Sequence, residues 1–276
     1  MFPVLFKIGP ISIYSFGLMM GIGFLVASYI LTKELKRKGI DPNIGSTITL
    51  FALIFGIVGS KVLYLLENWN EFMQDRSTAF SPGGLTWYGG LILATLAIFV
   101  YTKKKKFQFL TICDASAPAL MLGYGIARLG CHLAGDGDYG MPTDLPWATV
   151  YAKGTYPPSI AFQDFPEVIQ QYGVNGIVPD TTPVHPAPVY EFFLSVLVFI
   201  VLWKLRKNTY VSGRLFTIYL ILSSCARLLV EFIRINPRIL LDLTEAQIIS
   251  SIIIIIALVS MLMLSKRKHV QISSSQ

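Results

Sequence analysis

The segment ARLGCHLAGDGDYG at residues 127–140 places an arginine and a histidine within a stretch that its apolar residues mark as membrane-spanning. A charged side chain at the bilayer centre costs about 2.5–3.5 kcal/mol on insertion scales, so Arg128 requires a partner, a water-filled cavity or an anionic substrate. His132 follows four residues later and therefore lies on the same helical face. Its imidazole either acts as a general base or is a satisfied histidine at the membrane interface, and the sequence supports both interpretations.

A second group of charges lies nearer the C-terminus. Arg227, Glu231 and Arg234 stand at offsets of zero, four and seven, which aligns them along one face of a helix. An internal salt bridge is the simplest explanation, because Glu231 is within reach of both arginines. Two cations for one anion nevertheless leave surplus positive charge, and we favour a site for an external anion such as a lipid phosphate.

Other charged residues have less specific patterns. The candidate partners of Arg128 are Asp114, Glu191 and Glu231, and the sequence does not choose among them. Lys61 lies within another apolar stretch, where a structural or snorkelling role is expected. Asp136 and Asp138 resemble a weak metal motif, but further oxygen ligands are not apparent, so we expect no bound metal.

The elements that must position these residues are membrane helices. The chain is 53% hydrophobic and 14% charged, whereas soluble proteins are about 25% charged. About 20 apolar residues span the hydrocarbon core, and this length predicts an all-α polytopic membrane protein with about seven transmembrane helices. The expected spans lie near residues 14–31, 47–66, 86–101, 111–134, 188–203, 213–233 and 247–264.

Basic residues predict the orientation of these spans, because cytoplasmic loops collect Lys and Arg. Clusters at residues 33–38, 103–106, 204–207 and 266–268 all fall on one side, which places the N-terminus outside and the C-terminus inside. The net charge of +7 is then explained by topology and anionic lipid, so nucleic acid is not an expected partner. We expect residues 1–13 to lie along the interface.

The only long polar connection, residues 135–186, falls on the outer side between the fourth and fifth spans. It is rich in Pro, Tyr, Asp and Gly and contains scattered aromatic residues. Connections of this length are usually functional or disordered, and the aromatics favour an ordered periplasmic or extracellular cap. We therefore expect one integral-membrane domain over residues 1–276, with residues 135–186 as a cap inserted within it.

Two more segments bear on the site. GGLTWYGG at residues 83–90 has the glycine content of close backbone approach. HPAPVYE at residues 185–191 contains prolines that suit a helix start, and it would carry Glu191 into the membrane with Tyr190 at the interface.

Together these segments resemble the bacterial phosphatidylglycerol:prolipoprotein diacylglyceryl transferase family. The resemblance covers most of the chain and includes, in order, FKIGPISIYSFGLMMGIGF, GGLTWYGGLI, ARLGCHLAGDGDYG, HPAPVYE and RLLVEFIR. It implies transfer of a diacylglyceryl group from phosphatidylglycerol to the lipobox cysteine of a preprolipoprotein, in the bacterial plasma (inner) membrane and without a cofactor. Arg128 and Arg227 would then stabilise the phosphate that leaves.

The family motifs carry over onto this chain in part. The matching residues are Arg128, Gly130, His185, Tyr190, Arg227 and Glu231. We expect catalytic roles for Arg128, His132, Arg227 and Tyr88. We expect substrate binding by Arg128, Gly130, Glu231, Arg234, His185, Tyr190, Glu191, Gly89 and Gly90.

The sequence departs from the family pattern at three positions. Tyr88 replaces a histidine often proposed as the base, Phe16 replaces a tyrosine and Cys131 replaces an asparagine. A tyrosine with a pKa near 10 is a poor base at neutral pH, so we hypothesise that His132 takes over this role. These departures leave open a paralogue with another acceptor or phospholipid. A lipid-binding or transport protein is disfavoured by the long cap and by the lack of a visible repeat.

Overall fold

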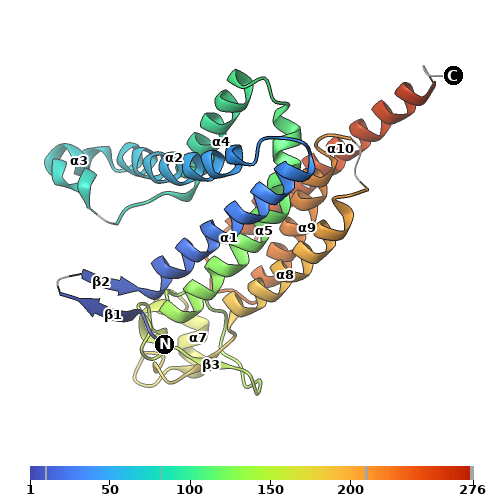
Figure 1. The fold of residues 1–276 in the computed structure, drawn as a ribbon. Coiled ribbons are helices and arrows are strands. Elements are labelled where there is room, and N and C mark those ends of the chain that lie inside the picture. The colour runs from blue at the N-terminus through green and yellow to red at the C-terminus, as the bar shows by residue number, and fades with distance from the viewer. Residues whose placement is uncertain (10, 82, 209–210, 274–276) are drawn as a thin grey trace. The chain divides into compact units, whose positions relative to one another are not determined.

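The computed structural model describes residues 1–9, 11–81, 83–208 and 211–273 (Figure 1). Only the backbone is described at residues 8, 11 and 266–273, so the side chains of the basic cluster at residues 266–268 lie outside the described part. The chain divides into two compact units, of which the first comprises residues 1–27 with 117–276 and the second comprises residues 28–116. Two helices, α1 (Ser15–Arg37) and α5 (Phe109–Ala134), contribute to both units.

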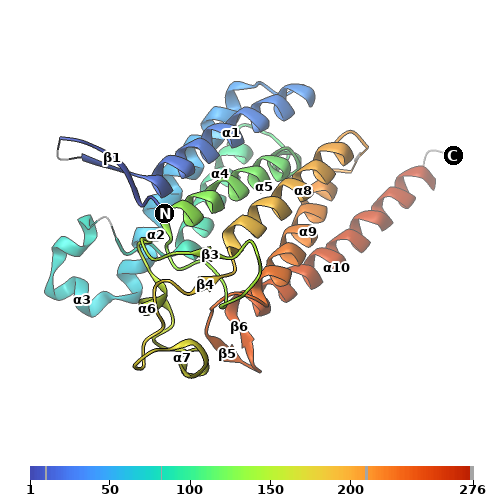
Figure 2. The same ribbon diagram turned by 90° about the horizontal axis from the view of Figure 1, so that it is seen from below.

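The first unit begins with a β-hairpin and contains three further long helices. Strands β1 (Val4–Ile8) and β2 (Ile11–Tyr14) pair antiparallel and lead into α1. Helix α9 (Arg214–Glu231) packs against both α8 (Ala187–Leu205) and α10 (Glu245–Ser273), as Figures 1 and 2 show. Apolar side chains from α5, α8 and α9 form a buried cluster of Ala117, Met121, Val198, Leu202 and Leu215.

The long connection between α5 and α8 folds around an apolar core of its own. Its elements are β3 (Thr149–Val150), α6 (Pro158–Ala161), α7 (Pro166–Tyr172) and β4 (Pro183–Val184), and β3 pairs antiparallel with β4. Tyr139 and Tyr151 are buried and stack with ring centroids 4.5 Å apart. The core cluster contains Tyr139, Tyr151, Ala161, Phe162, Val168, Val178 and Val184. Tyr139, Tyr151 and Phe162 therefore fill a hydrophobic interior, whereas Trp147 and Tyr156 of the same segment are exposed.

A short hairpin connects α9 to α10. Strands β5 (Arg238–Leu240) and β6 (Leu243–Thr244) pair antiparallel (Figure 2). Leu241 and Asp242 form the turn with φ angles of 51° and 59°, a left-handed conformation that is uncommon for leucine. Leu240 and Leu241 are exposed at its tip.

In the second unit, α2 (Asn43–Glu67) packs against α4 (Trp87–Lys104), with α3 (Trp69–Gln74) and the 3₁₀ helix η1 (Arg76–Phe80) between them in the chain. The two helices approach closely at Gly59 and Gly89, where a Cβ on either residue would collide with the carbonyl oxygen of the other. These glycines lack the side chains that would hold the two backbones apart. Gly90 lies beside them, against Ser60 and Gly56.

The protein is mostly helical, and five of the described helices are long and apolar enough to cross a membrane. They are α1, α2, α5, α8 and the part of α10 from Glu245 to Ser265. The two other spans expected from the sequence coincide with α4 and α9. Helix α9 contains Arg214, Arg227 and Glu231, and α4 ends at Lys103 and Lys104, which makes both less apolar than the five.

Candidate functional site

The predicted charged residues of the first unit meet in one cluster, which we call the charge cluster. It contains Arg128 on α5, Glu191 on α8, Arg227 and Glu231 on α9, and Asp138 and Arg234 in the loops that follow α5 and α9. These residues come from three helices and two loops. The cluster therefore depends on tertiary packing of the whole unit.

A backbone contact brings the two loops together. The Met141 N–H donates to the Ile233 carbonyl at 2.8 Å, and Gly140 forms an isolated bridge with Arg234. A Cβ at position 140 would collide with the Ile233 carbonyl oxygen. Glycine at this position therefore lets the loop after α5 lie against the end of α9, which sets Asp138 beside Arg234.

Glu191 is the centre of the charge cluster and is 3% exposed. One oxygen, Oε2, lies 2.9 Å from Arg128 Nε and 3.5 Å from Arg234 Nη1. The other, Oε1, lies 2.8 Å from Arg227 Nη1. Tyr124 also donates its hydroxyl to Oε1 at 2.9 Å, and the Arg128 guanidinium sits 5.0 Å from the Tyr124 ring centroid. A single carboxylate thus contacts three arginines.

Glu231 is buried and held from both sides. Its Oε2 lies 2.8 Å from Arg227 Nη2, which is the i,i+4 salt bridge that the sequence suggests. Its Oε1 accepts hydrogen bonds from Thr244 Oγ1 at 2.7 Å and Asn236 Nδ2 at 2.6 Å. The two donors satisfy Oε1, and the Arg227 guanidinium offsets the charge at Oε2, of a carboxylate whose burial alone would be costly.

Asp138 completes the cluster by bridging two arginines. Its Oδ2 pairs with Arg128 Nη1 and its Oδ1 pairs with Arg234 Nη2. Burial raises the pKa of Asp138, but the positive charges of Arg234 and Arg128 outweigh it and bring the pKa to about 2. Asp138 is therefore ionised at neutral pH.

The charge balance corrects one expectation from the sequence. The arginine stripe suggested surplus positive charge, yet Glu191 and Asp138 arrive from other elements. The described cluster contains three arginines and three carboxylates. The expected surplus of positive charge is wrong, because helical spacing shows only the partners on the same helix.

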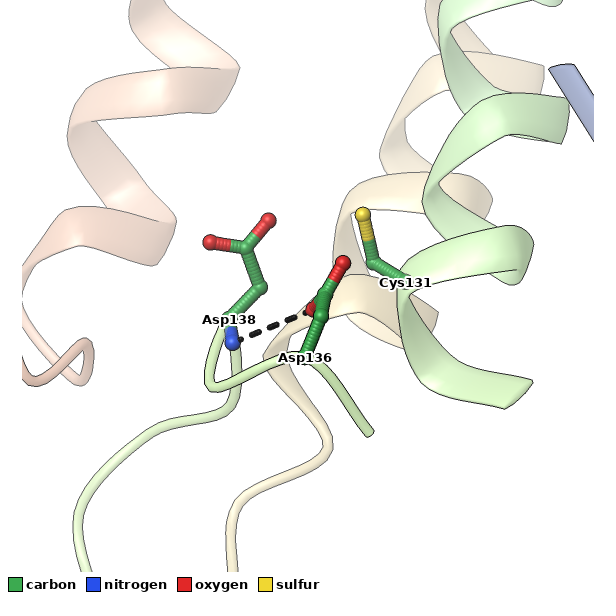
Figure 3. Close-up of side chains that lie close together, drawn as sticks. All are labelled: Cys131, Asp136 and Asp138. Atoms are coloured by element: carbon green, nitrogen blue, oxygen red, sulfur yellow. Dashed lines mark hydrogen bonds between the residues drawn. The ribbon is translucent and has the colours of Figure 1, made fainter. Parts of the chain in front are cut away.

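Asp136 lies in the same loop but has a different environment. Figure 3 shows its side chain beside the Cys131 thiol, and its Oδ1 accepts the Asp138 N–H at 3.4 Å. Burial and the neighbouring Asp138 raise the pKa of Asp136. The potential ligand atoms of Cys131, Asp136 and Asp138 lie within 4.8 Å of one another. The two arginines on Asp138 disfavour a cation there by charge repulsion.

His132 lies in an adjacent pocket rather than among the charges. A pocket of about 550 Å³ is lined by His132, Trp147, Thr149, Pro186, Val189, Tyr190 and Phe193. The His132 Nδ1 is 2.8 Å from the Tyr151 hydroxyl. Tyr190, which also lines the pocket, accepts a hydrogen bond from Trp147 Nε1 at 2.7 Å. The lining is mostly apolar, with the imidazole as a basic group.

His185 lies next to this pocket at the start of α8. Its Nδ1 is 3.3 Å from the Tyr190 hydroxyl. Burial lowers the pKa of His185, which favours its neutral form. His185 also pairs through its backbone with Gly140 and Met141, because the Gly140 N–H donates to its carbonyl at 2.9 Å.

The remaining predicted residues lie at helix contacts. Gly130 faces Phe16 and Met19 of α1, and its Cβ would come within 3.0 Å of Met19 Cβ. Tyr88, Gly89 and Gly90 belong to the second unit, at the start of α4. The Tyr88 ring packs edge-on against Trp87. The structure thus assigns packing contacts to the three glycines.

Four polar contacts of the cluster were missed from the sequence. Tyr124 stands four residues before Arg128, so helical spacing could have identified it. Asp138 was noticed only as half of an acidic pair. Thr244 and Asn236 gave no signal, because Thr244 returns to Glu231 only through the hairpin and Asn236 reaches it from the irregular loop after α9.

Fold and site together define a polytopic helical membrane protein with a partly buried cluster of arginines and carboxylates. The sequence model described as "Prolipoprotein diacylglyceryl transferase" matches residues 3–263, and the chain belongs to this family. The resemblance drawn from the five motifs is therefore confirmed.

Curated relatives agree over most of their length. The protein named "Phosphatidylglycerol--prolipoprotein diacylglyceryl transferase" in Clostridioides difficile is 31% identical over 98% of this chain and 98% of its own. Proteins of the same name are 31% identical in Clostridium tetani, over 86% of each chain, and 30% identical in Trichormus variabilis, over 97% of this chain and 91% of the relative.

Proposed function

We propose that the protein transfers the diacylglyceryl group of phosphatidylglycerol to the lipobox cysteine of prolipoproteins. The observation that carries this proposal is the charge cluster, whose three arginines are brought together by α5, α9 and the loop after α9 in a chain of this family. Guanidinium groups bind phosphate oxygens through paired, charge-assisted hydrogen bonds. The cluster thus supplies the chemistry that a phospholipid headgroup requires.

The proposed reaction is a displacement at carbon. The cysteine thiolate forms a C–S bond with the diacylglyceryl group, the C–O bond to phosphate breaks, and glycerol phosphate leaves with the electron pair. Arg128 and Arg227 stabilise the charge that develops on the leaving phosphate. Arg234 binds the same group from the other end of the cluster. Glu191 and Glu231 hold the three arginines in position.

The thiol must lose its proton before it attacks. We assign this role to His132, because it lies one helical turn from Arg128 and lines the apolar pocket beside the cluster. His185 and Tyr190 flank the same pocket and are proposed to contact substrate. Tyr88, with Gly89 and Gly90, is proposed to orient the lipid, and Gly130 to admit it close to α5.

We further propose seven transmembrane helices, with α4 and α9 added to the five apolar ones. The alternation of basic clusters supports an external N-terminus, an internal C-terminus and residence in the bacterial plasma membrane. On this topology residues 135–186 form a cap on the outer face, within a single domain. Its separate apolar core supports such a role.

The decisive test is transfer by the purified protein in phosphatidylglycerol vesicles. A lipobox peptide is added, and mass spectrometry follows whether its cysteine gains a diacylglyceryl group. His132→Gln is assayed beside the wild type. Modification by the wild type alone supports both the activity and the base. Modification by both retains the enzyme but eliminates His132 as an essential base, and no modification by the wild type favours a paralogous transferase or transporter.

A further inference from the structure

Asp138 occupies the position that a bound anion would take. Its two carboxylate oxygens each face a different guanidinium, one from Arg128 and one from Arg234. A phosphate binds arginines in the same way, with separate oxygens directed at separate donors. The protein thus provides an anionic group of its own at the arginines that the substrate needs.

Asp138 is also the most accessible of the three carboxylates. Its side chain is 29% exposed, against 3% for Glu191 and 0% for Glu231. Glu191 is held by Tyr124, and Glu231 by Thr244 and Asn236. Asp138 lies in a loop rather than a helix, directly after Gly137, whose φ of 89° favours glycine. An incoming anion therefore meets the charge of Asp138 first.

The reaction changes the charge of the ligand at this position. Phosphatidylglycerol is a phosphodiester with one negative charge, whereas glycerol phosphate is a monoester that carries about −1.5 to −2 at pH 7. Repulsion from a fixed carboxylate is proportional to the ligand charge. A negative side chain beside the phosphate consequently disfavours the product more than the substrate.

We propose that Asp138 is a specificity-determining residue that selects monoanionic phosphodiesters and expels the dianionic phosphomonoester. This inference rests on the proposed function for the identity of the diester. Asp138 shares Arg128 and Arg234 with the phosphate and keeps the cluster neutral in the absence of lipid. With Asp138 charged, a second negative charge on the ligand brings no gain in binding. With Asp138 neutralised, that second charge becomes favourable.

The test compares two phosphate ligands of different charge. The wild type, Asp138→Asn and the control Asp136→Asn are placed in phosphatidylcholine nanodiscs, and calorimetry measures the binding of glycerol phosphate and of dimethyl phosphate. Since the repulsion scales with charge, Asp138→Asn should tighten the binding of dimethyl phosphate about threefold and the binding of glycerol phosphate about tenfold. Asp136→Asn makes the same chemical change two residues away, where no salt bridge to an arginine is broken. It should change the affinities for the two ligands by much more similar factors.

Equal effects of Asp138→Asn on both ligands, or weaker binding of both, would overturn the proposal. A pH series on the wild type gives a test that does not depend on any variant. From about pH 5 to pH 7.5 glycerol phosphate gains its second charge while dimethyl phosphate does not. The affinity of the wild type for glycerol phosphate, relative to its affinity for dimethyl phosphate, should not rise at the higher pH. A relative gain of about fivefold or more would contradict charge selection by Asp138.

The same measurements separate this inference from the proposed function. Charge discrimination in nanodiscs without transfer in phosphatidylglycerol vesicles would contradict the proposed transferase activity and would still support charge selection by Asp138. Diacylglyceryl transfer without discrimination between the two phosphate ligands would contradict only charge selection by Asp138. Asp138→Glu retains the charge and should retain the wild-type preference.

Discussion

Each unit of the molecule holds a cation within a membrane-type helix, and the two units do so differently. Lys61 on α2 donates to neutral oxygens of one loop, the Ser81 carbonyl and hydroxyl at 3.0 Å and the Gly83 carbonyl at 2.9 Å. Arg128 on α5 pairs instead with carboxylates from two other elements. A cation satisfied by nearby carbonyls secures a loop. A cation shared between carboxylates of other elements ties those elements to its own helix.

The largest expected effect is on catalysis. Arg128→Ala should lower diacylglyceryl transfer by at least about 100-fold, because it removes a donor aimed at the leaving phosphate. The vesicle assay measures the rate, and membrane insertion is checked by extraction. Activity above about a tenth of wild type would remove Arg128 from the proposed phosphate site. Arg128→Lys serves as the control that keeps the charge but loses the bidentate geometry.

The second largest effect is expected on thermal stability, which should respond differently to the loss of a carboxylate charge in the two units. Glu191→Gln removes the charge that three arginines share, and breaking a buried ion pair from one side typically costs about 3–5 kcal/mol. We expect a marked fall in the thermal midpoint in detergent. Glu67→Gln is the matched change in the second unit, where the exposed carboxylate accepts only the Thr86 hydroxyl at 3.0 Å among the contacts described. A similar fall for both variants would refute the central role of Glu191.

Packing in the second unit should respond to glycine substitution. Gly59→Ala places a methyl group against the Gly89 carbonyl and Leu93, so overpacking should cost about 1–3 kcal/mol. Gly56→Ala is the control on the same helix, since its Cβ would meet no atom within 4 Å. Thermal unfolding of both variants checks the difference. Equal stability of the two would show that α2 and α4 do not require this close contact.

The smallest effect is expected at Lys61. Lys61→Met removes three hydrogen bonds to an exposed loop, and the net cost should be about 1 kcal/mol, as for exposed hydrogen bonds in general. Faster proteolysis of the segment after η1 should accompany it. Lys61→Arg should restore resistance. Loss of transfer comparable with that of Arg128→Ala would abolish the contrast between the two cations.

The site was predictable to the extent that its partners share a helix or a motif. The i,i+4 pair of Arg227 and Glu231 is present at 2.8 Å, and Glu191 was among the candidates for Arg128. Asp138 was not, because its approach to Arg234 depends on the loop contact at Gly140. Local spacing cannot show which loops meet.

Prediction of the fold has a similar limit. The lengths of the apolar stretches located the helices, including α4 and α9. Among the described helices, however, five are long and apolar enough to cross a membrane, and α4 and α9 are not among them. Helix α9 falls short because it contains three charged residues, Arg214 and the two members of the charge cluster, Arg227 and Glu231. Two of the residues that weaken the signal of α9 as a membrane helix thus belong to the site. The separate core of residues 135–186 followed in outline from its aromatics, although the stacking of Tyr139 on Tyr151 did not.

The spacing of the charge cluster along the chain has a consequence for assembly during synthesis. Asp138 lies ten residues after Arg128, whereas its second partner, Arg234, is 96 residues further on. Of the two carboxylates that pair with Arg128, Asp138 is therefore synthesised first, before Glu191 and α9. The same carboxylate is therefore available to Arg128 before the rest of the cluster is made, and it joins Arg128 to Arg234 in the folded protein.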